Sequence, residues 1–286
     1  MASITSADVP SKSLFLFFAL AFGIAWGVFT AYLLAGDRAA EIFGEISAAH
    51  PLFILAVYAP AISALLIVAA STGLTGLGRF LSRLLLWRLS WPWLLLVLVG
   101  LPAFYFAGSL IKGNTGEAPL FTQAFATVLP VLAFMLILGP VEEIGWRGLA
   151  LPILQRHMAP LWAGLLLGLV WGVWHLPAFF LSGTPQSAWG FTPFLVGAVS
   201  VSVILTPLFN SARGSILWAA LFHFQLNNPL WPDAQPYDMW FFAAAALVVV
   251  WLNRADMLRR GGSVTTVAPD RAHSLGDGRR AEAKGR

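Results

Sequence analysis

The sequence lacks cysteine altogether and contains few charged residues. With no cysteine among 286 residues, disulfide scaffolds, iron–sulfur clusters and thiolate zinc sites are excluded. Charged residues make up only 10% of the chain and hydrophobic residues 58%, whereas soluble domains have about 25% and 45–50%. So few charges cannot cover the surface of a soluble globule, which excludes an ordinary soluble enzyme and a disordered protein. The composition predicts a polytopic membrane protein.

Hydrophobic runs of about the length that a membrane helix needs, roughly 20 residues, occur eight times. We therefore predict an all-α, polytopic membrane helix bundle with about eight transmembrane helices, in a domain that covers residues 1–253. The seventh run is the weakest, because it is short and polar residues interrupt it. The predicted helices cover about 13–35, 51–71, 91–111, 120–139, 160–181, 193–209, 215–230 and 238–253.

The formal net charge of +4 belongs to the C-terminal tail. Residues 254–286 contain 8 Lys and Arg against 4 Asp and Glu, whereas residues 1–253 contain 9 of each. The excess of basic residues therefore does not indicate a nucleic-acid-binding face, and we expect no nucleic-acid partner. We predict that residues 254–286 form a solvated, disordered cytoplasmic tail without a function of its own. The alternative is that its basic residues bind anionic membrane lipid.

The positive charges between the predicted helices set the orientation of the bundle. If both termini face the cytoplasm, fifteen Lys and Arg lie inside, and only Arg38 and Lys112 lie outside. Short cytoplasmic loops carry an excess of Lys and Arg, so we predict cytoplasmic termini in a bacterial inner membrane.

Three charged residues stand at the end of the fourth hydrophobic run. The run reaches Gly139-Pro140, where we expect the helix to end at the edge of the bilayer. Glu143 and Arg147 are spaced i,i+4 and can pair, which leaves Glu142 about 100° away on the helix, free to act as a general base. An ordinary juxtamembrane charge cluster would look the same from this segment alone.

Two histidines lie within predicted membrane helices. His175 is in the fifth run, and His223 is in the seventh with Asn227 one helical turn away. A carboxylate and an imidazole can activate water, and a second imidazole with an amide can stabilise an oxyanion. The alternative is a zinc site made of His175, His223 and Glu142 or Glu143, although the H-E-x-x-H motif is absent.

These residues resemble the motifs of the CPBP family, which groups CAAX prenyl endopeptidases with bacterial CAAX-protease-like and bacteriocin-processing proteins. Glu142-Glu143-Ile144-Gly145-Trp146-Arg147 resembles its E-E-x-x-x-R signature. Trp171 to His175 is similar to its second motif, with Trp where Phe is usual, and His223 to Asn227 is similar to its third. The resemblance covers a motif core at about 120–230.

The resemblance implies roles for each residue of this core. Glu142 and His175 would activate water, and His223 and Asn227 would form the oxyanion site. The remaining motif residues, Glu143 and Arg147, would be structural. The tryptophans at 146 and 171 depart from the family pattern, and we expect them to alter the shape of the pocket more than its chemistry.

The implied function is that of an intramembrane endopeptidase cutting a membrane-associated or CAAX-like protein or peptide, with its site open to the inner face. The family has long been classed with metalloproteases. We favour a glutamate-dependent mechanism with no cofactor, and zinc remains the alternative. A non-catalytic scaffold or immunity factor and an ion-coupled transporter are the competing hypotheses. The protease hypothesis predicts that Glu142, His175, His223 and Asn227 converge on one cavity.

Overall fold

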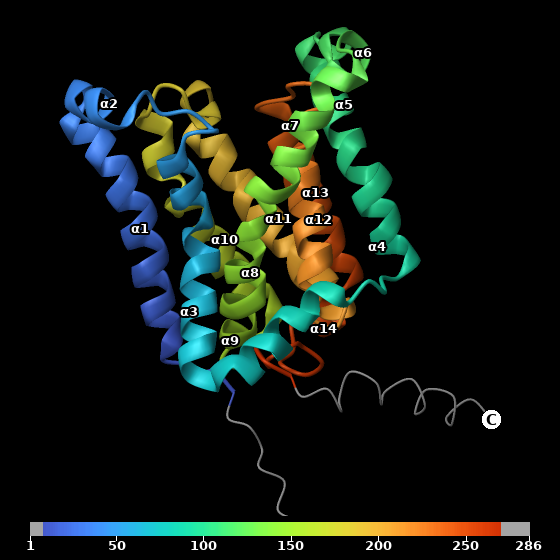
Figure 1. Ribbon diagram of the computed structural model, residues 1–286. Coiled ribbons are helices and arrows are strands. Elements are labelled where there is room, and N and C mark those ends of the chain that lie inside the picture. Colours follow the sequence, from blue (N-terminus) through green and yellow to red (C-terminus); the bar gives the residue numbers. More distant parts are fainter. Residues whose placement is uncertain (1–7, 270–286) are drawn as a thin grey trace, which may run out of the picture.

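The computed structural model describes residues 8–269, and the regular structure of this part is entirely helical (Figure 1). The predicted all-α membrane helix bundle is confirmed. Long helices run alternately up and down between two faces of the molecule, and both described ends of the chain lie at the lower face in Figure 1. The main helices are α1 (Ser13–Ala35), α3 (Pro51–Leu81), α5 (Leu101–Lys112), α7 (Phe125–Leu138), α10 (Pro160–Trp174), α11 (Phe191–Ser211), α12 (Ile216–Leu226) and α13 (Tyr237–Leu252).

Short helical segments connect or extend these helices. A five-residue π-helical stretch joins α4 to α5, and α2 and α6 lie at the upper face. A proline stands at the first position of α3 and of α10, where its missing N–H costs no hydrogen bond. The bounds of the short helices are α2 (Asp37–Phe43), α4 (Trp91–Leu95), α6 (Pro119–Thr122), α8 (Glu143–Gly145), α9 (Leu151–Gln155) and α14 (Arg254–Met257).

All eight predicted membrane helices are present as helices. Six segments of the described chain are long and apolar enough to span a membrane: 13–35, 51–85, 91–112, 125–155, 160–180 and 191–211. The two that remain, α12 and α13, are apolar but shorter. The seventh run, expected to be the least certain membrane helix, forms the short helix α12. A count of eight complete spans stays a prediction.

The fourth span differs from the prediction. The helical segment does not end at Gly139-Pro140. A 3-10 turn at Pro140–Glu142, α8, a π-helical stretch at Trp146–Ala150 and α9 continue it to Gln155. Gly145 allows this continuation to press against α3, since a Cβ atom there would lie 2.5 Å from the carbonyl oxygen of Pro60. Glu142 and Glu143 consequently lie in the middle of a spanning segment.

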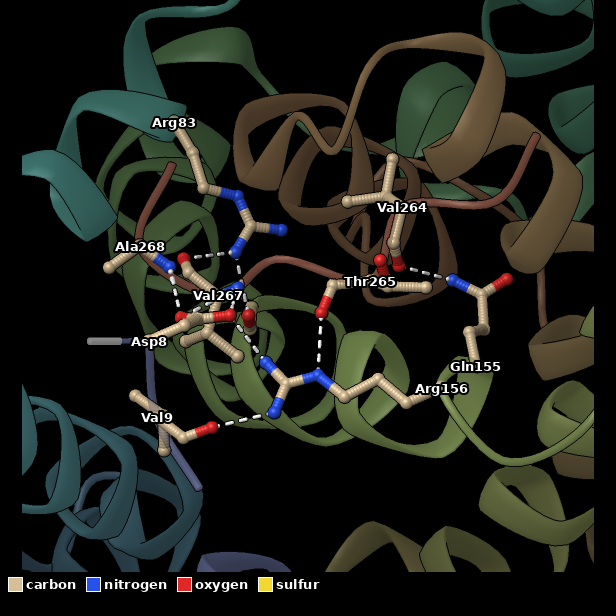
Figure 2. A network of polar contacts seen from close by, with 10 residues as sticks. Asp8, Val9, Arg83, Gln155, Arg156, Val264, Thr265, Val267 and Ala268 are labelled. Carbon is tan, nitrogen blue, oxygen red and sulfur yellow. Dashed lines mark hydrogen bonds and ion pairs between the residues drawn. The ribbon is translucent and has the colours of Figure 1, made fainter. Parts of the chain in front are cut away.

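The first part of the C-terminal tail also differs from the prediction of a disordered segment. Residues 254–269 are packed against the lower face, where Val267 and Ala268 are buried; residues 270–286 lie outside the described part. Arg156 hydrogen-bonds to the carbonyl oxygens of Val9 and Thr265 at 2.6 and 2.8 Å and forms an ion pair with Asp8 (Figure 2). We call this contact between Asp8, Val9, Arg156 and residues 264–268 the basal clasp. The clasp joins both ends of the described chain at one face.

A buried arginine ties the clasp to the motif segment. Arg83 is 1% exposed and donates hydrogen bonds to the carbonyl oxygens of Gly148, Gly214 and Val267, at 2.7, 2.8 and 3.0 Å. Three segments that are distant in sequence therefore meet on one guanidinium group. Arg83 and Arg156 are among the fifteen Lys and Arg predicted to lie on the cytoplasmic side, and a charge count alone does not show which cations are anchors of this kind.

Candidate active site

A cavity of about 570 Å³ lies within the bundle, and all four predicted catalytic residues line it. Glu142 comes from the turn that follows α7, His175 from the end of α10, and His223 and Asn227 from the end of α12. Residues separated by up to 85 positions are thus brought to one space. This convergence is the arrangement that the protease hypothesis predicted, although convergence alone does not assign their roles.

Glu142 is buried and held by two indole groups. Its Oε2 atom accepts a hydrogen bond from Trp171 Nε1 at 2.9 Å and from Trp146 Nε1 at 3.2 Å. No described residue hydrogen-bonds to Oε1, so this oxygen is available to the cavity that Glu142 lines. The two tryptophans were expected to alter the shape of the pocket more than its chemistry, and the sequence did not indicate that both donate hydrogen bonds to the carboxylate.

His175 is fixed in one tautomer by its own helix. Its Nδ1 atom lies 2.8 Å from the carbonyl oxygen of Trp171, and because a carbonyl oxygen only accepts, Nδ1 carries the proton. In the neutral ring Nε2 is then an acceptor. The ring packs against Trp171, Trp174 and Phe194 with centroid distances of 5.4, 4.8 and 5.0 Å, which restrict its orientation.

Glu143 and Arg147 form the predicted i,i+4 pair, with both side chains fully buried. Arg147 Nη1 lies 3.1 Å from Glu143 Oε1. The same oxygen lies 2.8 Å from His223 Nδ1, a contact that spacing in the sequence does not indicate. Neither Glu143 nor Arg147 lines the cavity. Their contacts place them behind the cavity wall, where Glu143 orients His223.

Gly139 makes room for the third motif. A Cβ atom at this position would clash with Asn227 Nδ2 and would lie 3.1 Å from His223 Nε2. Because Gly139 has no side chain, Asn227 and His223 can pack against it where they line the cavity. The sequence marked Gly139 as part of a helix-breaking Gly-Pro pair and did not show this second requirement.

The alternative zinc ligands do not form a metal-binding group. Within the described residues, no three His, Asp or Glu side chains are close enough together to hold a metal ion. Oε2 of Glu142 is engaged by two indoles, and Oε1 of Glu143 by Arg147 and His223. The set His175, His223 and Glu142 or Glu143 therefore does not fit a metal in this arrangement.

The cavity reaches the face opposite the termini. Its lining includes Ala48, Asn114, Gln186 and Asp233, which lie in the connections at the upper end of the bundle in Figure 1. The expectation that the site opens to the same face as the termini is wrong. It depended on Glu142 standing at a helix end near the inner surface, whereas the span continues to Gln155.

Comparisons with known proteins agree with the motifs. Residues 123–228 match the family described as type II CAAX prenyl endopeptidase, Rce1-like. The chain is also 31% identical over 140 residues to the CAAX prenyl protease 2 of Methanococcus maripaludis. This aligned region covers 47% of this chain and 49% of that relative. The chain thus spans about half the length of this curated relative. Six helices of spanning length make the chain an integral membrane protein, and its residues 123–228 are similar to the Rce1-like CAAX prenyl endopeptidase family.

Proposed function

We propose that the protein is an intramembrane endopeptidase that hydrolyses a peptide bond of a membrane-associated or CAAX-like substrate. The observation that carries the proposal is that Glu142, His175, His223 and Asn227 line one cavity within the bundle. Ionisable groups at membrane depth are costly and usually serve a function. The family match adds support, because the matched relative is itself a CAAX prenyl protease.

In the proposed reaction, Glu142 and His175 hold a water molecule between them. Glu142 takes a proton from the water as its oxygen attacks the carbonyl carbon of the scissile bond. The indoles of Trp146 and Trp171 hold the carboxylate in position through Oε2, which leaves the other oxygen to act as the base. The same proton then passes to the departing amine as the C–N bond breaks.

His223 and Asn227 are the proposed donors to the oxyanion. His223 Nδ1 lies 2.8 Å from a carboxylate oxygen of Glu143, so donation from Nε2 requires a proton on both ring nitrogens. Losing one oxyanion donor typically slows a reaction about 100-fold or more, and we expect Asn227→Ala to lower kcat by about that factor.

The proposed mechanism uses no cofactor. We expect the purified protein to keep its activity after exhaustive treatment with a strong zinc chelator. Loss of activity on chelation, with recovery on adding zinc alone, would contradict the glutamate mechanism and indicate a metalloprotease that uses His175, His223 and Glu142 or Glu143.

The experiment that tests the proposed function compares membrane peptides from cells that carry the wild-type protein or Glu142→Gln. Glu117→Gln is the matched control, because Glu117 also lines the cavity but lies in the connection at its mouth. New peptide termini should appear with the wild type and with Glu117→Gln and be missing with Glu142→Gln. Identical peptide sets in all three strains would favour the non-catalytic scaffold.

A further inference from the structure

The charge lining the cavity has one sign. Four carboxylates line it, from Glu117, Glu142, Asp233 and Asp238, and none of its described lining residues is Lys or Arg. Lys112 is near the mouth but is engaged by Asp233 Oδ2 at 2.6 Å and by the carbonyl oxygen of Gln235 at 3.1 Å. The cavity therefore carries more negative charge than its own cations neutralise.

Asp238 is the least expected of these carboxylates. It belongs to the first turn of α13, lines the cavity and is only 1% exposed. Its Oδ1 atom accepts a hydrogen bond from the backbone N–H of Met239 at 3.0 Å, and no described side chain hydrogen-bonds to its carboxylate. The start of a helix favours a nearby carboxylate, but a buried charge normally also has a paired partner. The proposed reaction gives Asp238 no role.

Unpaired polar atoms occur on other residues that line the cavity. Asn114 Oδ1 and Gln186 Oε1 are buried acceptors without a hydrogen-bond donor, and Trp231 Nε1 is a buried donor without an acceptor. Most buried polar atoms in proteins have a partner. With Asp238, these amide oxygens present three acceptor groups to the cavity against one donor. A ligand that supplies several N–H groups and a positive charge would satisfy them.

We propose that the buried carboxylate of Asp238 forms a subsite for a lysine or arginine side chain of the peptide substrate. This inference rests on the proposed function and names the substrate class of that same site. A cationic side chain would compensate the buried carboxylate, whereas an acidic side chain at the same place would meet a carboxylate that no described side chain hydrogen-bonds to. The subsite thus selects basic segments and disfavours acidic ones.

The test measures binding separately from cleavage. In the Glu142→Gln background, the protein is reconstituted in phosphatidylcholine liposomes, whose net charge is zero. The probes are N-palmitoylated, fluorescent decapeptides with an amidated C-terminus. Each peptide has one variable residue, Lys, Gln or Glu, placed in turn at every position. We expect the best-placed lysine peptide to bind about tenfold more tightly than its glutamine counterpart, and the glutamate peptide to bind most weakly.

Two further variants assign this preference to Asp238. Adding Asp238→Asn should abolish the lysine preference, whereas adding Glu41→Gln should keep it, because Glu41 is an exposed acid on the same face that does not line the cavity. Equal binding of the lysine and glutamine peptides with Asp238 intact would overturn the inference, even if Asp238→Asn failed to fold. If the wild type cleaved no peptide but the lysine preference held, the proposed protease function would fail and the subsite would stand.

Discussion

At the residue scale, the indole of Trp171 is the clearest contributor to the position of Glu142. Trp171→Phe keeps an aromatic ring in the wall of the cavity but removes the N–H that donates to Oε2 at 2.9 Å. Hydrogen bonds to charged groups contribute about 1.5–3 kcal/mol, so we expect kcat to fall at least about tenfold with little loss of folded protein. Steady-state kinetics on the purified variant measure this effect.

Trp189→Phe is the matched control for that variant. Trp189 lines the same cavity, and no hydrogen bond links it to Glu142. Equal activity of Trp171→Phe and Trp189→Phe would show that Trp171 fills space and does not hold the carboxylate.

The sequence predicted the polar residues of the site better than the hydrogen-bond partners that hold them in position. The i,i+4 spacing of Glu143 and Arg147 was sufficient to predict their ion pair, and three motifs in order predicted which side chains share the cavity. The contact of His223 with Glu143 and the indole bonds to Glu142 were not predictable. These contacts depend on the rotation of each helix about its axis relative to its neighbours. The hydropathy pattern of the sequence does not determine that rotation.

At the scale of elements, the hydrophobic runs placed every main helix, but the end of the fourth run was misread. Gly139-Pro140 has the pattern of a helix end, yet Pro140 begins a new turn that carries the chain onward. The continuation depends on contact between Gly145 and Pro60 of α3. A local pattern cannot show such a contact, so the depth of Glu142 in the bundle followed only from the structure.

The basal clasp yields a prediction about stability. Arg156→Ala removes two hydrogen bonds to carbonyl oxygens and the ion pair with Asp8. Because the paired side chains are partly exposed, at 20% and 29%, we expect a moderate loss of about 1–3 kcal/mol. Thermal unfolding in detergent should show a lower Tm than Arg259→Ala, which removes an exposed cation from the same tail. Equal Tm values would contradict a stabilising role for the clasp.

At the scale of the whole molecule, the charge bias and the cavity together predict the compartment from which a substrate would enter. Most cations of the described residues lie at the face of the termini, and the positive-inside rule predicts that this face is cytoplasmic. The cavity reaches the opposite face. Cytoplasmic termini and a cavity that opens to the cytoplasm are therefore incompatible, and the charge bias predicts an opening on the outer side.

The absence of cysteine makes this orientation simple to test. Gly116→Cys and Gly261→Cys introduce one thiol each at the mouth and on the tail, at positions where a side chain meets no neighbour within 4 Å. A membrane-impermeant maleimide added to intact cells should label Gly116→Cys at once and Gly261→Cys only after permeabilisation. The reverse pattern would show that the termini face outward and the cavity opens to the cytoplasm.

The assignment of Glu142 as the base that activates water is tested most directly by one rate comparison. A peptide cleaved in the wild-type strain is incubated with purified, liposome-reconstituted wild type, Glu142→Gln and Glu117→Gln, and the initial rate of bond hydrolysis is measured. The carboxylate at 142 is the proposed proton acceptor, and an amide cannot replace it. The account predicts no detectable hydrolysis by folded Glu142→Gln and a rate near that of the wild type for Glu117→Gln. Hydrolysis by folded Glu142→Gln at the wild-type rate would contradict it.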